Sequence, residues 1–405
     1  MLLIVESIVS DSDVDLRDDY RAQEYAAWID TELQPVAGLT EERLHEPPGV
    51  GLALLLAAPY AVGGPVAAEL FVAALLALAF AAAAALARRL VPDPWATGAA
   101  VTAGLSAPAL GWSTTIASEP VAAAAVAGAA LYTLRVRDEP TFRRATTAAL
   151  LIAVLPWLSV KYLPLAVVCA AALARWLRRR RRGLTAFAAL EVVLVPAVML
   201  ITVNERLYGG LTPYAAVPGD ATGASSAGDY AARAERLLTL WVDPQWGLLV
   251  WAPFGALAFY ALELLVRSVR ERLSVALPSV VDVQVTAGFL VALCAAGRAV
   301  AAFLAPVFED DAGFPGRELL PVVPVAAALA AWGLRHAPRI GAALAAVTVA
   351  GGAWLLIGAR AGDGELAPPS GPLPWGGAEV AVAVAAGAAA VFLLVRDLWR
   401  ERALA

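Results

Sequence analysis

The chain is poor in charge and in the residue types that build many soluble active sites. Only 16% of its 405 residues are charged, and it holds two cysteines, two histidines and a single lysine, Lys161. Cys169 and Cys294 both lie in apolar stretches, which excludes a disulfide framework and a thiolate metal site. No HExxH, GxSxG, paired CxxC or glycine-rich phosphate-binding motif occurs, so zinc proteolysis, serine hydrolysis and nucleotide hydrolysis have no support.

Apolar residues dominate instead. They make up 60% of the chain, and the mean hydropathy is +0.70. They are spread over many separate stretches of about 20 residues, which is the length that crosses a bilayer as a helix. The sequence therefore predicts an all-α polytopic transmembrane bundle, a single integral membrane domain over residues 1–405. Eleven spans are expected at 66–88, 95–112, 119–134, 145–160, 162–177, 184–204, 246–266, 280–304, 318–334, 340–359 and 377–395.

Two segments before the first span are irregular. Gly49–Gly64 is apolar but is interrupted by Pro59 and ends in a glycine pair, so we expect a re-entrant or interfacial segment. Met1–Val9 is apolar but too short to span a bilayer or to form a signal peptide. We interpret it as the outer end of a helix that begins upstream of this sequence.

Arginine clusters set the expected orientation. They fall between alternate spans, and loops rich in Arg or Lys face the cytoplasm. Such clusters contact anionic lipid headgroups, and a nucleic-acid partner is not expected. The clusters lie at 88–89, 135–144, 178–182, 267–272, 335–339 and 396–402. The protein is thus predicted to be a multi-pass cell-membrane protein whose other face, which carries 10–47, 112–119, 205–245, 308–316 and 361–376, is external.

The external segment 10–47 concentrates acid. It carries eleven acidic residues against three arginines. In an extended backbone Asp11, Asp13 and Asp15 would point the same way. Three carboxylates at the mouth of a bundle could bind a cation, act as a general base or form a solvated cap. An EF-hand loop that starts at Asp11 is excluded, because its sixth and twelfth positions would be Leu16 and Ala22.

Apolar and aromatic residues at helical spacing follow the acidic residues. Tyr25, Trp28, Ile29 and Leu33 recur at this spacing after Tyr20, which predicts an amphipathic helix on the membrane surface. An interfacial helix beside an acidic mouth is typical of an enzyme that acts on a lipid-borne substrate. The second long external loop, 205–245, is rich in Gly, Ser and Ala, and we expect a flexible stretch followed by a short helix.

Short motifs recur in order along most of the chain. They are Asp11–Tyr20, His45–Pro48 leading to Gly63–Gly64, Ser118–Pro120, Pro156–Tyr162, Asp243–Pro253 and Gly316–Pro321. These motifs resemble those of the GT-C superfamily of polytopic glycosyltransferases, specifically bacterial relatives of protein O-mannosyltransferases and of the lipid A aminoarabinose transferase. They depart from the family pattern at Ser159, where His is usual, and at Glu318, where Tyr is usual.

The resemblance implies a site on the external face. Asp13 is the first candidate for the base that takes the acceptor proton, and Asp11 is the second. Glu119 would orient the acceptor or a cation, although an acid at this position also stabilises a helix N-terminus. Lys161 and Arg317 would bind the donor phosphate, or else extend toward lipid headgroups. His45 and Asp15 are candidate substrate contacts. No cofactor is certain, and a divalent cation remains open.

The function expected from this resemblance is inverting transfer of a sugar from a polyprenyl-phosphate donor to a glycan, lipid or protein acceptor in the cell envelope. A polytopic transporter or lipid flippase is the main alternative, in which membrane acids relay protons and proline-broken helices move. A catalytically inactive membrane scaffold is the third.

Overall fold

The computed structural model is mainly helical, with no strand, in the part of the chain that it describes. These residues are 1–28, 32–35, 44–47, 49–180, 182–216, 226–243, 247–270, 278–305 and 316–361. Within them, six helices are long and apolar enough to cross a membrane. The all-α membrane class is therefore confirmed. The expected span at 377–395 and the external segments 308–315 and 362–376 lie outside the described residues.

The chain divides into two compact units. Unit 1 comprises Met1–Ala82, Ser113–Arg236 and Ala292–Asp310. Unit 2 comprises Ala83–Trp112, Leu237–Val291 and Asp311–Ala405. Each unit is built from segments that are distant in sequence, because helices from different parts of the chain bury their apolar faces against one another.

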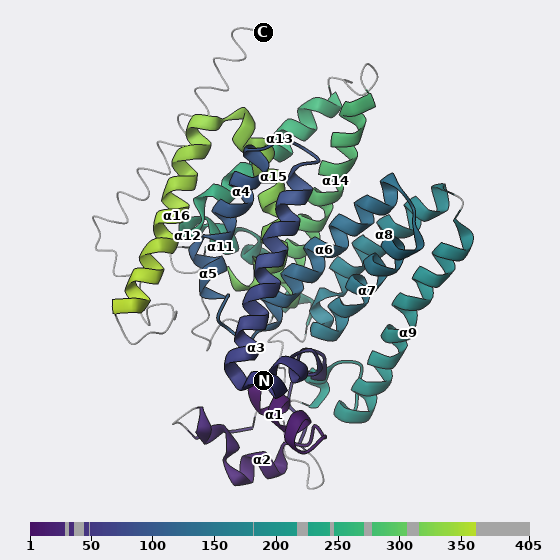
Figure 1. Ribbon diagram of the computed structural model, residues 1–405, viewed down its shortest axis with the longest axis vertical. Coiled ribbons are helices and arrows are strands. Elements are labelled where there is room, and N and C mark those ends of the chain that lie inside the picture. Colours follow the sequence, from purple (N-terminus) through teal and green to yellow (C-terminus); the bar gives the residue numbers. More distant parts are fainter. Residues whose placement is uncertain are drawn as a thin grey trace. The chain divides into compact units, whose positions relative to one another are not determined.

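Unit 1 is built around a series of helical hairpins. α6 (Ser118–Asp138), α7 (Phe142–Leu158), α8 (Leu163–Arg179) and α9 (Gly183–Tyr208) follow one another through short turns and lie side by side (Figure 1). Small residues permit the close packing: alanines of α6 and α7 are fully buried, and a Cβ on Gly128 would lie 3.0 Å from Leu151.

The N-terminal helices precede this series. α1 (Leu2–Ser10) is followed by α2 (Arg17–Ala22) and by the short 3₁₀ turn η1 (Glu24–Ala27). The single amphipathic helix predicted after Tyr20 is wrong, because Gln23 has a φ of 55° and breaks it into two short pieces. Tyr25 is buried, Leu33 is not helical, and Ile29 lies outside the described residues.

α3 (Val50–Ala87) contains the segment expected to be re-entrant or interfacial. The helix loses helical geometry at Gly63 and Gly64, the glycine pair at which the sequence predicted a break. The part after the break, Pro65 to Ala87, is about 34 Å long at a rise of about 1.5 Å per residue, so it can cross a bilayer by itself. The part before the break is also helical.

Unit 2 is centred on α15. α15 (Val323–His336) lies against α4 (Trp95–Gly104), α13 (Ala256–Arg270) and α16 (Pro338–Ala361), and α16 also packs on α5 (Ala107–Gly111). Gly333 permits the close approach of α13, since a Cβ there would strike the backbone oxygen of Leu257. α14 (Pro278–Ala299) runs from unit 2 into unit 1 and ends in a π-turn, η7 (Val300–Leu304).

Two expected spans are interrupted. The stretch 95–112 forms α4 and α5 with a break at Leu105 and Ser106. The stretch 246–266 forms the short α12 (Leu248–Trp251), the 3₁₀ turn η5 (Pro253–Gly255) and then α13. Proline at 108 and at 253 opens a new helical segment in each case, because proline lacks an N–H for the preceding turn.

Exposed apolar surface agrees with a lipid environment. α9 is apolar around most of its circumference, yet Leu184 is 89% exposed and Val198 63% exposed within the structure. A helix that is apolar on every face and not covered by protein is stable in lipid rather than in water. The eleven-span count and the single membrane domain stay predictions.

Candidate functional site

Unit 1 has an arginine-rich end and an opposite, acidic end. The turns after α6 and after α8 carry arginine clusters and adjoin, since Arg180 Nη2 donates to the carbonyl oxygen of Arg137 at 3.1 Å. Because the helices alternate in direction, the start of α6, the end of α7, the start of α8 and the end of α9 share the other end (Figure 1). We call this second end the acidic end.

The N-terminal segment belongs to the acidic end. Gly51, at the start of α3, lies directly against the carbonyl oxygen of Trp157, at the end of α7. A Cβ on Gly49 would lie 3.0 Å from Pro213, just after α9. The carboxylates that precede α3 therefore occupy the same end of unit 1 as Glu119 and Lys161.

Asp13 is held in a turn and reaches solvent. Its Oδ1 accepts a hydrogen bond from the Ser7 hydroxyl at 3.0 Å and another from the Asp15 N–H at 3.1 Å. The second bond is that of an Asx turn, which aspartate favours. Ser7 is fully buried in α1, whereas Asp13 is exposed. The result is an oriented carboxylate at the surface of the acidic end.

Asp15 has a different role. Its Oδ1 accepts hydrogen bonds from the backbone N–H of Leu44 at 2.9 Å and of Arg17 at 3.4 Å, and its Oδ2 pairs with the Arg17 guanidinium at 2.9 Å. Burial by itself would raise the pKa of Asp15, but these hydrogen bonds and the charge of Arg17 lower the pKa below its usual value. Asp15 thus joins two parts of the N-terminal segment that lie 29 positions apart.

The expected common face of Asp11, Asp13 and Asp15 does not form. Asp11 caps α1 with helical backbone angles, and Ser12 has a φ of 62°, so the backbone turns where an extended strand was considered. Asp11 instead approaches two acids that follow in the chain. Asp13 and Asp15 contact each other through the Asx turn.

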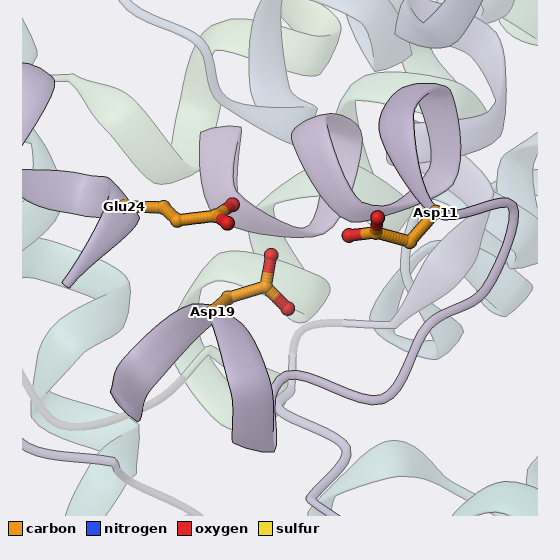
Figure 2. A group of neighbouring side chains, drawn as sticks. All are labelled: Asp11, Asp19 and Glu24. Carbon is orange, nitrogen blue, oxygen red and sulfur yellow. The ribbon is translucent and has the colours of Figure 1, made fainter. Parts of the chain in front are cut away.

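Asp11, Asp19 and Glu24 form the acidic cluster. One carboxylate oxygen from each lies within 4.8 Å of the other two, and Figure 2 shows the three side chains pointing toward one another. Asp19 is only 1% exposed, and with the carboxyls ionised neither of its oxygens has a hydrogen-bond partner among the described residues. Burial, and then the charges of Glu24 and Asp18, raise the pKa of Asp19 to about 7. Sequence reasoning missed Asp19 and Glu24 as a site.

His45 also lies beside the acidic segment. Its Nδ1 is 2.9 Å from the carbonyl oxygen of Val14, so this nitrogen carries the hydrogen and donates it. Its ring meets that of Tyr208 edge to face, with centroids 6.3 Å apart. Nε2 is buried and has no hydrogen-bond partner within the described ranges. A neutral His45 therefore offers an acceptor to a hydroxyl or another donor.

Glu119 and Lys161 form a buried ion pair at the acidic end. Lys161 Nζ lies 2.8 Å from Glu119 Oε1, and the side chains are 9% and 1% exposed. Glu119 is in the first turn of α6, where the helix dipole favours a carboxylate. Lys161 is in the 3₁₀ turn η2 (Val160–Tyr162), and its ammonium is 5.3 Å from the centroid of the Tyr162 ring. The structure thus joins two predicted site residues to each other.

The π-turn η7 lies beside η2, and the buried cation Arg233 is bound to η7. Arg233, in the 3₁₀ turn η4 (Arg233–Glu235), donates from Nη1 to the carbonyl oxygen of Phe303 at 2.8 Å, and its residue is 5% exposed. Arg236 reaches the carbonyl oxygen of Ala305 at 3.4 Å. Both cap the C-terminal carbonyls of a helix. This role was not predictable from the sequence, because no local pattern distinguishes Arg233, between the short helices α10 (Ala227–Ala232) and α11 (Arg236–Val242), from an exposed arginine.

Arg317 belongs to unit 2 and begins the 3₁₀ helix η8 (Arg317–Val322). Its guanidinium lies 5.3 Å from the centroid of the Trp112 ring, a cation–π contact. Gly316 has a φ of 79°, and a Cβ there would lie 2.8 Å from Leu248. Unit 2 therefore brings together two of the matching motif segments, the one that holds Leu248 and Gly316–Pro321, with Trp112, which begins an expected external turn.

Comparisons with known proteins give no relative: no family model, no curated protein and no solved structure matches the chain.

Proposed function

We propose that the protein is an inverting glycosyltransferase that moves a sugar from a polyprenyl-phosphate donor to an acceptor at the external membrane face. The observation that supports this best is the acidic end of unit 1, where an oriented, solvent-exposed carboxylate and a buried lysine lie at the end opposite to the arginine clusters. Glycosyl transfer needs a base for the acceptor hydroxyl and a cation for the departing phosphate.

Asp13 is the proposed base. Its carboxylate takes the proton of the acceptor hydroxyl while the hydroxyl oxygen attacks the anomeric carbon of the donor. The bond between that carbon and the phosphate oxygen breaks, and the phosphate leaves with the electron pair. Attack from the face opposite to the phosphate inverts the configuration. Ser7 and the Asp15 N–H fix the Asp13 side chain, so the base needs no reorganisation before the proton moves.

Lys161 is proposed to stabilise the leaving phosphate, with Glu119 as a positioning residue. Glu119 fixes the Lys161 ammonium beside the first turn of α6 and partly offsets its charge. His45 Nε2 is proposed to accept a hydrogen bond from a sugar or acceptor hydroxyl. Arg317 of unit 2 stays a proposed phosphate ligand on the sequence resemblance alone, since guanidinium groups favour two parallel N–H bonds to phosphate.

A transfer assay tests the assignment of Asp13. Purified protein in lipid nanodiscs is incubated with a panel of radiolabelled polyprenyl-phosphate sugars and an envelope extract as acceptor. Asp13→Asn is expected to lower the transfer rate by about 10²–10⁴-fold, the usual contribution of a general base. Asp18→Asn removes an exposed carboxylate of α2 and is the matched control, with an expected change of less than about 3-fold.

Two results would contradict this assignment. Full activity of Asp13→Asn with normal expression would exclude Asp13 as the base. Movement of the donor lipid across the bilayer without release of the sugar would favour the flippase alternative.

Arg317→Ala is expected to abolish transfer while the protein stays folded, and retained activity would exclude its phosphate role.

Thiol labelling tests the orientation. Ser12→Cys and Arg180→Cys are made separately in a chain with Cys169 and Cys294 changed to Ala, and intact cells are treated with an impermeant maleimide. Both positions are exposed, and they lie at the acidic and the arginine-rich ends of unit 1. Labelling at 12 with protection at 180 is expected. The reverse pattern would place the acidic end in the cytoplasm and exclude the proposed external reaction.

A further inference from the structure

The acidic cluster of Asp11, Asp19 and Glu24 takes no part in the mechanism above, yet it has the features of a binding site. Its members come from three elements: the C-terminal cap of α1, the helix α2 and the turn η1. Left-handed backbone at Ser12 and Gln23 turns the chain twice between them. In Figure 2 the three carboxylates converge on one point from different directions.

Asp19 is the residue that indicates a ligand. Its side chain is 1% exposed and points between the other two carboxylates. Neither of its oxygens meets a hydrogen-bond donor in the part of the chain that is described. A buried carboxylate without a donor or a counter-charge destabilises the folded protein, because its charge has lost the solvation of water. The neighbours Glu24 and Asp18 add negative charge and make an ionised Asp19 less stable still.

The distances fit a hard cation. Calcium binds oxygen at about 2.3–2.6 Å, and magnesium at about 2.0–2.1 Å. Two ligands on one ion are then separated by about 3–5 Å, depending on the ion and on the angle between them. The three oxygens lie within 4.8 Å of one another, so one ion can contact all three without rearrangement of the backbone.

We propose that Asp11, Asp19 and Glu24 bind one divalent cation of the calcium or magnesium class, which fixes α1, α2 and η1 to one another. Three carboxylates contribute a charge of about −3, which a divalent ion offsets to about −1. Asp11 and Glu24 are exposed, so water can complete the coordination. Asp19 supplies the buried ligand, and the ion satisfies the oxygens that the protein leaves without a donor.

This site is independent of the proposed glycosyl transfer, because ion binding is measured without a donor or an acceptor. The full chain is purified in detergent, freed of metal with EDTA, and titrated separately with Ca²⁺ and Mg²⁺ in a calorimeter. One saturable site is expected, and the ion that binds more tightly identifies the class. The same ion is expected to raise the melting temperature of the native protein.

Matched variants locate the ion. Asp19→Asn is expected to weaken binding at least about 10-fold and to remove the ion-dependent rise in melting temperature. Asp18→Asn removes the same charge from the adjacent, exposed position and is expected to change the affinity by less than about 3-fold. Glu24→Gln and Asp11→Asn change exposed ligands, so they give the same test if Asp19→Asn fails to fold.

Three results would overturn the proposal. The first is the absence of saturable binding of either ion to the native protein. The second is equal affinity of Asp19→Asn and the native protein. The third is a rise in the melting temperature of Asp19→Asn in EDTA together with no effect of either ion on the native protein, because a proton shared between Asp19 and Glu24 would then satisfy the cluster.

Discussion

Replacing Lys161 with methionine is expected to destabilise unit 1, because it leaves Glu119 charged and buried. The two side chains are 9% and 1% exposed, and Nζ lies 2.8 Å from Oε1. Breaking such a pair by removing one partner costs about 3–5 kcal/mol. Since about 1.4 kcal/mol is a factor of ten, the equilibrium between folded and unfolded protein changes by about 10²–10⁴-fold.

The double variant separates the pair from the rest of the site. Glu119→Gln combined with Lys161→Met removes both charges and conserves most of the volume, so its free energy of unfolding is expected to lie within about 1 kcal/mol of native, or above it. The sum of the single-variant losses should therefore exceed the loss in the double variant by several kcal/mol, which is the coupling energy of the pair.

A solvent-exposed pair in the same unit is the control. Arg144 Nη1 lies 2.7 Å from Glu139 Oε2, but these side chains are 35% and 66% exposed. Arg144→Met is expected to cost about 1 kcal/mol or less, because water screens an exposed pair. Free energies are measured by unfolding the detergent-solubilised protein with increasing SDS and following tryptophan fluorescence and circular dichroism.

Equal losses of stability in Lys161→Met and Arg144→Met, or additive effects of Lys161→Met and Glu119→Gln, would refute this prediction. Either result would mean that the buried pair contributes no more than a surface pair. Measuring transfer with the same variants distinguishes the roles, since a folded double variant that transfers no sugar would have lost the phosphate contact and not the fold.

Two further predictions concern the other unit and the N-terminal segment. Gly316→Ala is expected to lower the stability of unit 2 by about 1–3 kcal/mol, because its φ of 79° disfavours a side chain and its Cβ would lie 2.8 Å from Leu248. The control is Gly98→Ala in α4, which is expected to be neutral or stabilising because a Cβ there meets nothing within 4 Å. Equal melting temperatures of the two variants would contradict this prediction. Asp15→Asn is expected to lower the melting temperature at pH 7, where the native carboxylate holds Leu44. Because the folded state lowers the pKa of Asp15, this stabilisation is present above the unfolded pKa of about 4 and is lost as the pH falls through the lower folded value. The difference in melting temperature between the two proteins should therefore shrink as the pH is lowered below about 4, and a constant difference would exclude the assigned cause.

Much of the fold was readable from the sequence because hydropathy is a local property. A stretch such as 184–204 has enough apolar residues to specify a lipid-facing helix whatever its neighbours are, and it lies in α9. The break at Gly63 and Gly64 was also predictable, since glycine weakens a helix locally. Two expected spans were interrupted where proline begins a new segment, which hydropathy alone does not report.

The candidate site was only partly predictable. Asp13, Glu119 and Lys161 were named from short motifs, but nothing local specified that Glu119 and Lys161 would pair across 42 positions. The grouping of Asp11, Asp13 and Asp15 was wrong because it assumed extended backbone, while Ser12 and Asp13 form turns. The interfacial helix after Tyr20 was wrong because helical spacing does not reveal a left-handed residue such as Gln23.

The sequence by itself determined that the protein is helical and apolar. The balance of apolar and charged residues indicates lipid as the solvent, and in lipid a helix satisfies the hydrogen bonds of its own backbone. The tertiary structure alone decided which charges meet. Asp19 depends on two chain reversals to reach Asp11 and Glu24, and Lys161 depends on the packing of α6 against α7 and α8 to reach Glu119. The energy of an electrostatic contact depends on distance and burial, and both are set by how the helices pack rather than by the order of residues along them.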